Sequence, residues 1–493
     1  MTKSAILALD QGTTSSRAIL FDESARPIDS AQREFEQIYP DNGWVEHDPE
    51  AIWETTLWAA RKMLRRAKRD GITIKAIGIT NQRETTLLWN RKTGKPIYNA
   101  IVWQDRRTAE QCEKLREKNG AAAIADKTGL IVDPYFSATK IAWILDNVKD
   151  ARKAAKAGEL AFGTVDSFLI WRLTGGTRHV TDATNASRTN LFNIKTQKWD
   201  AALLKFFDVP DTVLPEVLDC ADDFGLTEKS VLGEAIPILG VAGDQQAALI
   251  GQGCFKPGQI KSTYGTGCFV VLNTGGKIVR SQHRLLSTVG YRLGGKTTYA
   301  LEGSIFVAGA AIQWLRDGLK IIKKAEDTEA MARSVEDSGG VTVVPAFTGL
   351  GAPHWDAEAR GAVLGLTRAT TREHIVRATL ESLCYQTADL LNAMTEDGVS
   401  ARVINVDGGM VANDWFCEYL SAVLGIPATR PDFMETTALG AAYLAGRECG
   451  LYPEYSKLSE KWPHSSTFNE AMSVKTRKAL MSNWHRNVKR VLD

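Results

Sequence analysis

The chain has 493 residues, more than one hydrophobic core usually organises, so we expect two domains of about 200 to 250 residues each. Lys and Arg number 60 against 58 Asp and Glu, which gives no basic surface of the kind that binds nucleic acid, and no such partner is expected. The seven scattered cysteines form no Cys-x-x-Cys pair and no apolar run reaches the roughly 18 residues of a membrane span, so we expect a cytoplasmic protein without a transmembrane segment.

The first predicted element is a β-hairpin over LALDQGTTSSRAILF, residues 7–21. One glycine and a series of hydroxyl residues separate two β-prone runs, and glycine lets the backbone approach a ligand closely. Consecutive amides and hydroxyls in such a turn suit phosphate oxygens, although neither a P-loop nor a Rossmann fingerprint is present. Asp10, at the end of the first run, is placed to hold a hydrated Mg²⁺. A purely polar hairpin turn is the alternative.

The next elements are a helix and a strand that leads into polar residues. Asp48 and Gly71 mark the two ends of a helix that has an apolar face of period 3.6. The β-rich run at 74–80 is followed by Arg83 and Glu84. Ligands of α/β proteins bind at the carboxyl ends of strands, so this pair could point into a cleft. A salt bridge on the surface is the alternative.

Two aromatic residues come next, Trp103 in IVWQDRRT and Tyr135 in DPYFSATK. Pockets for small ligands combine aromatic faces with a few charged or polar groups that fix the ligand's orientation. Packing in the hydrophobic core is the alternative for both rings. Together with Arg83 and Glu84, the two rings predict a pocket for a small polyol.

Asp244 and Gln245 stand between a β-rich run at 236–243 and a run of small residues that predicts a helix. A single Asp at the start of a helix commonly caps it. The other interpretation is a carboxylate that accepts a hydroxyl proton during phosphoryl transfer, a reaction that needs one base to orient the nucleophile.

The second half repeats the order of the first. IKSTYGTGCFVVL (260–272) again reads as strand, Gly-Thr turn and strand, so two facing loops could hold one triphosphate. No linker separates the halves, and we use this repeat to expect domains at 1–251 and 252–493. A strand at 403–409 ends in a glycine pair that could admit an adenine or a sugar, and Asn413 begins the next helix.

A long helix is predicted ahead of that strand. Thr370 and Glu373 stand at the spacing of a capping box, and Gly398 follows the last apolar residues of the helix. Strands and helices alternate along the whole chain, which predicts α/β layers in both halves.

Seven segments now carry a resemblance to a known family, and they occur in the order ALDQGTTSSRA, NQRETT, VWQDRR, SATKIAW, AGDQQAAL, YGTGCF and VDGGMVAND. In this order and at these separations they resemble the FGGY carbohydrate-kinase family, and within it the branch that phosphorylates glycerol. The resemblance extends over almost the whole chain. It implies an α/β fold of two actin-like (RNase H-like) domains around a cleft that binds ATP.

The resemblance also implies roles for individual residues. The nucleotide would contact Thr13, Thr14, Ser15, Arg17, Thr266, Gly309, Gln313, Gly409 and Asn413. The glycerol pocket would consist of Arg83, Glu84, Trp103, Tyr135, Asp244, Gln245 and Phe269. Asp244 is implied as the catalytic base, Mg²⁺ would lie near Asp10 through water, and the products would be sn-glycerol 3-phosphate and ADP. A homodimer or homotetramer is expected from the same resemblance.

Two other functions compete with this interpretation. A xylulose or ribulose kinase of the same family would share the nucleotide loops, but Arg83, Glu84, Trp103 and Phe269 favour the smaller triol. An actin-like or chaperone-like ATPase would share the fold, but it would leave these residues and Asp244 without a role.

Overall fold

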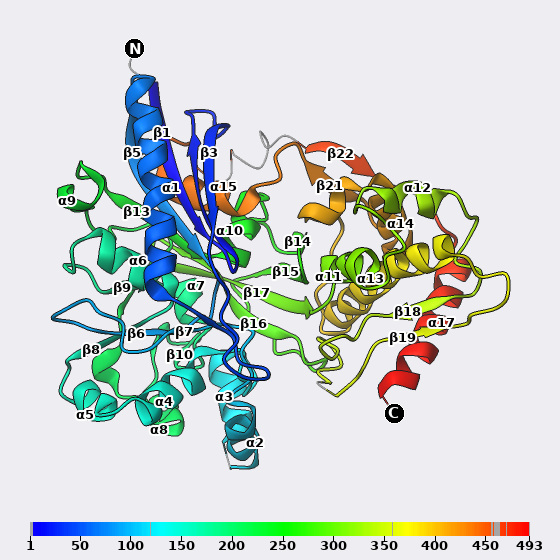
Figure 1. The fold of residues 1–493 in the computed structure, drawn as a ribbon, viewed down its shortest axis with the longest axis horizontal. Coiled ribbons are helices and arrows are strands. Elements are labelled where there is room, and N and C mark those ends of the chain that lie inside the picture. The colour runs from blue at the N-terminus through cyan, green and yellow to red at the C-terminus, as the bar shows by residue number, and fades with distance from the viewer. Residues whose placement is uncertain are drawn as a thin grey trace.

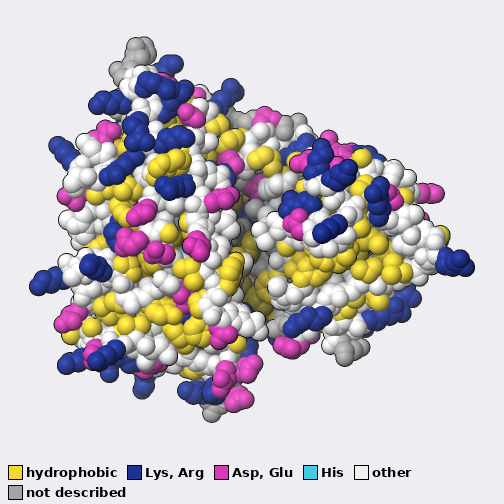
Figure 2. Space-filling view, in the orientation of Figure 1, with side chains coloured by type: hydrophobic (Ala, Val, Ile, Leu, Met, Phe, Trp, Pro, Cys, Tyr) yellow, Lys and Arg dark blue, Asp and Glu magenta, His cyan; other side chains and the backbone are white. Residues whose placement is uncertain are grey.

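The computed structural model describes residues 3–118, 120–356, 358–454, 457, 464–469 and 471–492. A five-stranded and a seven-stranded β-sheet, each with flanking helices, form two lobes (Figure 1), which confirms the α/β prediction. The space-filling view shows a furrow between the lobes (Figure 2). Within the described ranges, no helix is long and apolar enough to cross a membrane.

The sheet of the first half has five strands in the order β13 (Ile238–Gly243), β5 (Ile72–Asn81), β1 (Lys3–Gln11), β2 (Ser15–Phe21) and β3 (Pro27–Glu34). β1 and β2 pair antiparallel and form the predicted hairpin, with Asp10 opposite Arg17. β1, β5 and β13 run parallel to one another. Their carboxyl ends therefore meet at one edge of the sheet, where ligand-binding residues are expected.

Helix α1 (Pro49–Arg69) packs against this sheet and confirms the predicted helix. Asp48 caps it, because its carboxylate accepts a hydrogen bond of 2.9 Å from the backbone N–H of Glu50. Ile52, Met63 and other apolar residues of one face are buried.

The remaining elements of the first half are β4 (Glu46–His47), β6 (Leu87–Asn90), β7 (Ala100–Ile101), α2 (Ala109–Glu117), α3 (Ala121–Thr128), α4 (Ser137–Asn147), α5 (Ala151–Lys156), β8 (Leu160–Gly163), α6 (Val165–Leu173), β9 (Val180–Asp182), α7 (Ala183–Ala186), β10 (Phe192–Asn193), β11 (Lys198–Trp199), α8 (Ala201–Phe207), β12 (Glu216–Leu218), α9 (Lys229–Leu232) and α10 (Asp244–Gly251).

The sheet of the second half has seven strands in the order β16 (Leu286–Leu293), β17 (Lys296–Ile305), β15 (Cys268–Gly275), β14 (Ile260–Tyr264), β20 (Ile404–Asp407), β21 (Ala428–Pro431) and β22 (His464–Phe468). β14 and β15 form an antiparallel hairpin, so the predicted repeat of strand, Gly-Thr turn and strand is confirmed. β14 and β20 run parallel, with Thr263 opposite Asp407. The Gly-Thr turn and the glycine pair after β20 therefore lie at the same edge of this sheet.

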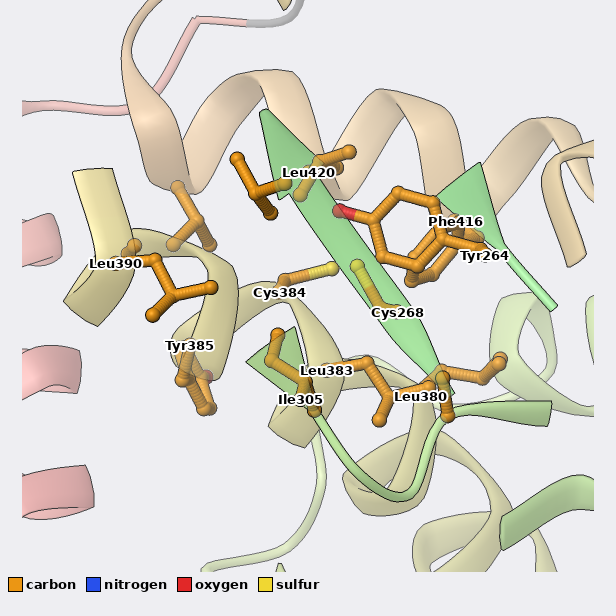
Figure 3. Packing of buried hydrophobic residues seen from close by; sticks show 14 of the residues in the cluster. Tyr264, Cys268, Ile305, Leu380, Leu383, Cys384, Tyr385, Leu390, Phe416 and Leu420 are labelled. Carbon is orange, nitrogen blue, oxygen red and sulfur yellow. The ribbon is translucent and has the colours of Figure 1, made fainter. Parts of the chain in front are cut away.

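Helices α13 (Arg372–Glu396) and α14 (Asp414–Leu424) pack over these strands through apolar side chains such as Leu383 and Phe416 (Figure 3). The predicted capping box was placed one residue too early. The backbone N–H of Thr371 donates to Nδ1 of His374 at 3.1 Å, and this pair forms the box. Thr370 is engaged elsewhere, since its hydroxyl oxygen accepts a hydrogen bond of 2.9 Å from the backbone N–H of Thr367.

The other elements of the second half are α11 (Gly309–Gln313), α12 (Asp327–Arg333), β18 (Thr342–Val344), β19 (Ala362–Leu364), α15 (Thr436–Glu448) and α17 (Val474–Leu492). Helix α15 does not stay with its own sheet. It packs against β1, β5, β13 and α10 of the first half, and it appears in orange within the lobe of blue and cyan segments (Figure 1). The domain boundary at residue 251 stays a prediction, because α15 of the second half packs against elements of the first half.

Glycines allow this close crossing. A Cβ atom on Gly78 of β5 would lie 2.1 Å from the carbonyl oxygen of Ala441 in α15. One on Gly440 would lie 1.9 Å from the carbonyl oxygen of Ala247 in α10. Both distances are far below van der Waals contact, so α15 can lie against the sheet and α10 only where these side chains are absent.

Gly78→Ala should therefore push α15 away from the first sheet. Overpacking of this kind lowers the free energy of unfolding by about 1 to 3 kcal/mol, and thermal unfolding of the purified variant measures it. Gly276→Ala is the matched control, because an added Cβ there meets no atom within 4 Å, and it should shift the free energy by less than about 0.5 kcal/mol. Equal unfolding midpoints for both variants would contradict the described contact of α15.

Candidate active site

The parallel strands of the first sheet bring three charged residues to one edge. Asp10 lies near the end of β1, Arg83 follows β5, and Asp244 follows β13 directly. The strand register aligns these ends, since Asp10 is opposite Thr80 and Thr80 is opposite Ala242. The prediction that polar residues gather at the carboxyl ends of strands is confirmed for this edge.

The turn of the first hairpin is held from several sides. The backbone N–H of Gly12 donates to the carbonyl of Ser15 at 2.9 Å, and the indole Nε1 of Trp103 donates to Oγ1 of Thr13 at 2.9 Å. Below the turn, the side-chain amide of Gln82 donates to Oε1 of Gln11 at 2.9 Å. Thr14 remains exposed at the tip. The turn is thus a braced loop whose outer side is open to a ligand.

Arg17 of this hairpin makes an ion pair with Glu435, the residue that precedes α15. The pair links the hairpin to the helix that crosses from the second half. The side chain of Arg17 is 23% exposed. Arg17 is therefore partly accessible to a ligand at the turn, although its positive charge is paired with the carboxylate of Glu435.

Arg83 is the most highly connected residue of the site. Its Nε lies 3.2 Å from the carboxylate of Asp244, and its Nη1 and Nη2 lie 2.5 and 3.2 Å from the two carboxylate oxygens of Glu302. Nη2 also donates to the hydroxyl of Tyr135 at 3.3 Å. The side chains of Arg83 and Glu84 are only 2% and 1% exposed, which excludes the alternative of a surface salt bridge.

Two further residues complete this cluster, and the sequence did not single them out. Arg188 is buried, and it donates to Glu84 at 2.6 Å and to Glu302 at 2.8 Å. Burial opposes the charged form of Glu302, yet the guanidinium groups of Arg188 and Arg83 outweigh it and lower the pKa of this carboxyl to about 2. For Glu84 burial dominates and raises the pKa above its ordinary value, although both arginines act in the opposite direction.

Asp244 is the first residue of α10, and the N-cap is Gly243, so Asp244 does not act as the cap. Its Oδ1 accepts a hydrogen bond of 2.7 Å from the backbone N–H of Gln245. The side chain is 31% exposed, which makes it the accessible carboxylate beside Arg83. This placement suits a group that exchanges a proton with a bound ligand.

A buried lysine supports the neighbouring polar group. Nζ of Lys261, on β14, hydrogen-bonds to the side-chain oxygen of Gln245 and donates to the carbonyl of Phe269 at 3.3 Å. Burial lowers the pKa of Lys261, which is opposed by the nearby charges of Asp407 and Asp244. Lys261 was also missed by the sequence analysis, and it joins the second half to the start of α10.

Three aromatic rings surround Arg83. The ring of Trp103 lies edge-on to those of Tyr135 and Phe269, with centroids 5.8 and 6.0 Å apart. The guanidinium carbon of Arg83 lies 6.0 Å from the centroid of Phe269. Trp103, Tyr135 and Phe269 are only partly buried, so they line the site and do not fill the core. The structure therefore gathers the residues predicted for a polyol pocket.

The candidate nucleotide residues of the second half lie around its glycine turns. The backbone N–H of Gly309 donates to the carbonyl of Gly265 at 2.9 Å, which places the start of α11 against the turn that contains Thr266. An added Cβ on Gly408 would lie 2.3 Å from the carbonyl oxygen of Tyr264, whereas one on Gly409 would meet no atom within 4 Å. Gly408 thus packs against β14, and Gly409 faces open space.

Two other candidates border this region. Asn413 caps α14, because its Oδ1 accepts a hydrogen bond of 2.9 Å from the backbone N–H of Phe416. Gln313 ends α11 and is exposed. The Gly265–Gly309 contact, the pairing of β14 with β20 and the cap of α14 arrange these residues along one edge of the second sheet.

Asp10 and Asp244 are two neighbouring carboxylates at the edge of the first sheet. Burial raises the pKa of Asp10 to about 6, the charge of Arg17 opposes this shift, and the nearby Asp244 adds to it. Among the residues that the structure describes, no three His, Cys, Asp or Glu side chains converge on one point. Such a pair suits Mg²⁺, which commonly binds to one or two carboxylates together with substrate phosphates and water.

The chain matches one family over most of its length. Residues 5–251 match the N-terminal domain of the FGGY family of carbohydrate kinases, and residues 260–449 match its C-terminal domain. A protein named glycerol kinase from Rhodospirillum centenum is 60% identical over 485 residues, which cover 98% of this chain and 97% of that protein. Another of that name from Ectopseudomonas mendocina is 58% identical over 487 residues, 99% of this chain and 98% of that protein.

Solved structures show the same likeness. Glycerol kinase from Plasmodium falciparum with ADP superposes with a TM-score of 0.94 at 38% identity, over 100% of this chain and 99% of that one. Gluconate kinase from Lactobacillus acidophilus superposes with a TM-score of 0.88 at 22% identity, over 99% of this chain and 97% of that one, and this likeness concerns the fold alone. The expected fold of two actin-like α/β domains is thereby confirmed.

His47 lies beneath the hairpin and supplies a test of this arrangement by pH. Burial lowers the pKa of His47 from 6.5 to about 4, so the folded protein takes up this proton at lower pH than the unfolded chain does. The free energy of unfolding is therefore unaffected by His47 above pH 6.5. It decreases as the pH falls toward 4, by up to about 3 kcal/mol, because the unfolded chain binds the proton more tightly.

His47→Gln removes this titration while it keeps groups that can hydrogen-bond to Gln37 and Gln82. Urea unfolding at about pH 7 and about pH 4.5 should therefore show a smaller loss of stability for the variant than for the wild type. The slope with pH is the measured quantity, since the substitution itself changes the absolute value. Parallel slopes would show that His47 does not titrate as described.

Proposed function

The chain belongs to the FGGY family of carbohydrate kinases, and we propose that it transfers the γ-phosphoryl group of ATP to a terminal hydroxyl of glycerol. The observation that carries this proposal is the convergence of Arg83, Asp244 and three aromatic rings at the edge of the first sheet. The relatives named glycerol kinase, at about 58 to 60% identity over nearly the whole chain, support the same acceptor.

In the proposed reaction Asp244 acts as the general base. A hydroxyl proton of glycerol passes to the Asp244 carboxylate while the hydroxyl oxygen forms a bond to the γ-phosphorus. The bond between the γ-phosphorus and the bridging oxygen breaks in line, and ADP leaves. Arg83 supports this step because its Nε lies 3.2 Å from Asp244 and orients this carboxylate at the start of α10.

The acceptor pocket follows from the same geometry. Arg83, Glu84 and Gln245 would hydrogen-bond to the hydroxyl groups, and the rings of Trp103, Tyr135 and Phe269 would cover the C–H side. Phe269 and Lys261 belong to the second half, whereas Arg83 belongs to the first. Both halves therefore contribute to the proposed pocket, which would exclude water from the reacting oxygen.

The nucleotide would lie across the furrow between the lobes. We assign its phosphates to the braced hairpin, at Thr13, Thr14, Ser15 and Arg17, and to the facing turn at Thr266. Gly309, Gln313, Gly409 and Asn413 would border the remainder of the nucleotide, where Gly409 leaves open space beside the backbone. The ADP-bound relative at 38% identity supports a nucleotide site in this fold.

Mg²⁺ fits the two carboxylates at the strand ends. Asp10 would hold it through water with Asp244 nearby, and when bound it would offset the charge that develops on the phosphates. A cytoplasmic homodimer or homotetramer stays a proposal that rests on membership of the family.

The acceptor is tested by a panel of substrates. With Mg-ATP, we expect strong ADP release with glycerol and little with xylulose, ribulose, gluconate or no acceptor, and a product whose mass is that of glycerol phosphate. The pocket formed by Arg83, Glu84, Trp103 and Phe269 is the reason for this preference. A pentulose that outpaces glycerol would leave the fold intact and refute the assignment of a triol pocket.

Asp244→Asn tests the proposed base. Removal of a general base lowers the turnover number by about 10² to 10⁴, so we expect a loss of kcat in this range with a smaller change in the KM for glycerol. Asp211→Asn is a suitable control, because Asp211 is exposed on a 3-10 turn of the first half. Retention of near-full kcat by Asp244→Asn at saturating glycerol would assign the base elsewhere.

A further inference from the structure

Glu302 is a buried carboxylate to which the proposed reaction assigns no role. It lies on β17 of the second half and its side chain has no exposed surface. Its carboxylate accepts hydrogen bonds from Nη1 and Nη2 of Arg83, at 2.5 and 3.2 Å, and from Nη2 of Arg188 at 2.8 Å. Two cations of the first half are thus held by one anion of the second half.

Arg188 extends the same cluster toward the other charged residue of the pocket. Its Nε donates to Oε1 of Glu84 at 2.6 Å, and its guanidinium lies 5.7 Å from the centroid of the Tyr135 ring. Arg83 and Glu84 would contact the acceptor, whereas Glu302 and Arg188 lie behind them. Arg83 and Glu84 are therefore each anchored by a buried side chain of opposite charge.

The cost of burial makes a purely structural role a poor explanation of this cluster. Charged groups lose their hydration when buried, and a well-packed apolar cluster of similar volume is commonly at least as stable as a buried ion pair. Glu302, Arg83 and Arg188 are nevertheless all buried at the edge of the pocket. Their arrangement is best explained by what they hold in place.

We propose that Glu302 and Arg188 are positioning residues of the phosphoryl-transfer site: Glu302 orients Arg83 from the opposite half, and Arg188 orients Glu84. This inference rests on the proposed function, since the roles are defined relative to the acceptor. The binding geometry of the pocket is then complete only where β17 lies against the first half.

The distances show what Glu302 prevents. Arg83 has two other carboxylates within reach, Asp244 at 3.2 Å and Glu84 at 3.7 Å. Both groups already pair with Arg83, so removal of the Glu302 charge would leave the buried guanidinium to be balanced by the two carboxylates that are assigned to the acceptor. Glu302 therefore gives Arg83 a counter-charge through both carboxylate oxygens, so that Asp244 and Glu84 do not have to balance the guanidinium alone.

Glu302→Gln preserves the shape of the side chain and removes its charge. We expect the KM for glycerol to rise at least about tenfold, because charge-assisted hydrogen bonds to Arg83 are replaced by weaker neutral ones. Direct binding of ADP in the absence of glycerol should change by less than about twofold. ADP is an informative probe because β17 ends at Ile305 and leads into α11, which borders the nucleotide.

Glu381→Gln is the matched control. Glu381 is a buried carboxylate of the second half that pairs with Arg377 at 2.9 Å on α13, outside the pocket. It should leave the KM for glycerol and the affinity for ADP unchanged. Arg188→Lys and Arg188→Met form a second pair, in which the lysine variant keeps the charge and should retain a lower KM for glycerol than the methionine variant.

The outcomes separate this inference from the proposed function. If the wild type does not phosphorylate glycerol, the proposed function fails. If the wild type is active and Glu302→Gln keeps its KM for glycerol within about twofold, the positioning role fails alone. An equal loss of ADP affinity would also overturn it, because it would show general damage to β17.

If Glu302→Gln does not fold, the double variant E302Q/R188Q replaces it. This variant removes one anion and one cation, keeps the buried charge balanced and is judged by the same two measurements.

Discussion

The burial of the Arg83 guanidinium is the interaction on which the site depends. A buried cation is stable only when carboxylates and hydrogen-bond acceptors surround it. Arg83 finds these partners in Asp244 and Tyr135 of the first half and in Glu302 of the second half. Satisfying one side chain therefore requires three chain segments that are remote in sequence, and their meeting point is the pocket.

The backbone makes this meeting possible at the carboxyl ends of parallel strands. β1, β5 and β13 end together, which places Asp10, Arg83 and Asp244 at one edge. Helix α15 then crosses from the second half onto the same sheet, where Gly78 and Gly440 allow backbones to approach closely. The two halves share packing as well as the ion cluster.

Much of the fold could be predicted from local signals. The caps and apolar period of α1, the strand before Arg83 and the two hairpins were expected from residue pattern alone, because those signals act between residues close in sequence. The capping box of α13 was misplaced by one residue, since Thr370 bonds to Thr367 and leaves the cap to Thr371. Boundaries of this kind depend on competing hydrogen bonds that residue spacing does not distinguish.

The sequence by itself determined the α/β class, the two glycine-rich hairpins, and Arg83, Glu84 and Asp244 as candidates, because each stands at the end of a recognisable strand. Glu302 and Lys261 each interrupt a β-rich run with a charge, which was the one signal that could have revealed them. Their partners lie far away in the chain, so only the tertiary structure decided that Glu302 meets Arg83 and Arg188. The physical reason is that a charge in a strand can be buried only where the fold brings its counter-charges, and pairing over such separations leaves no local pattern.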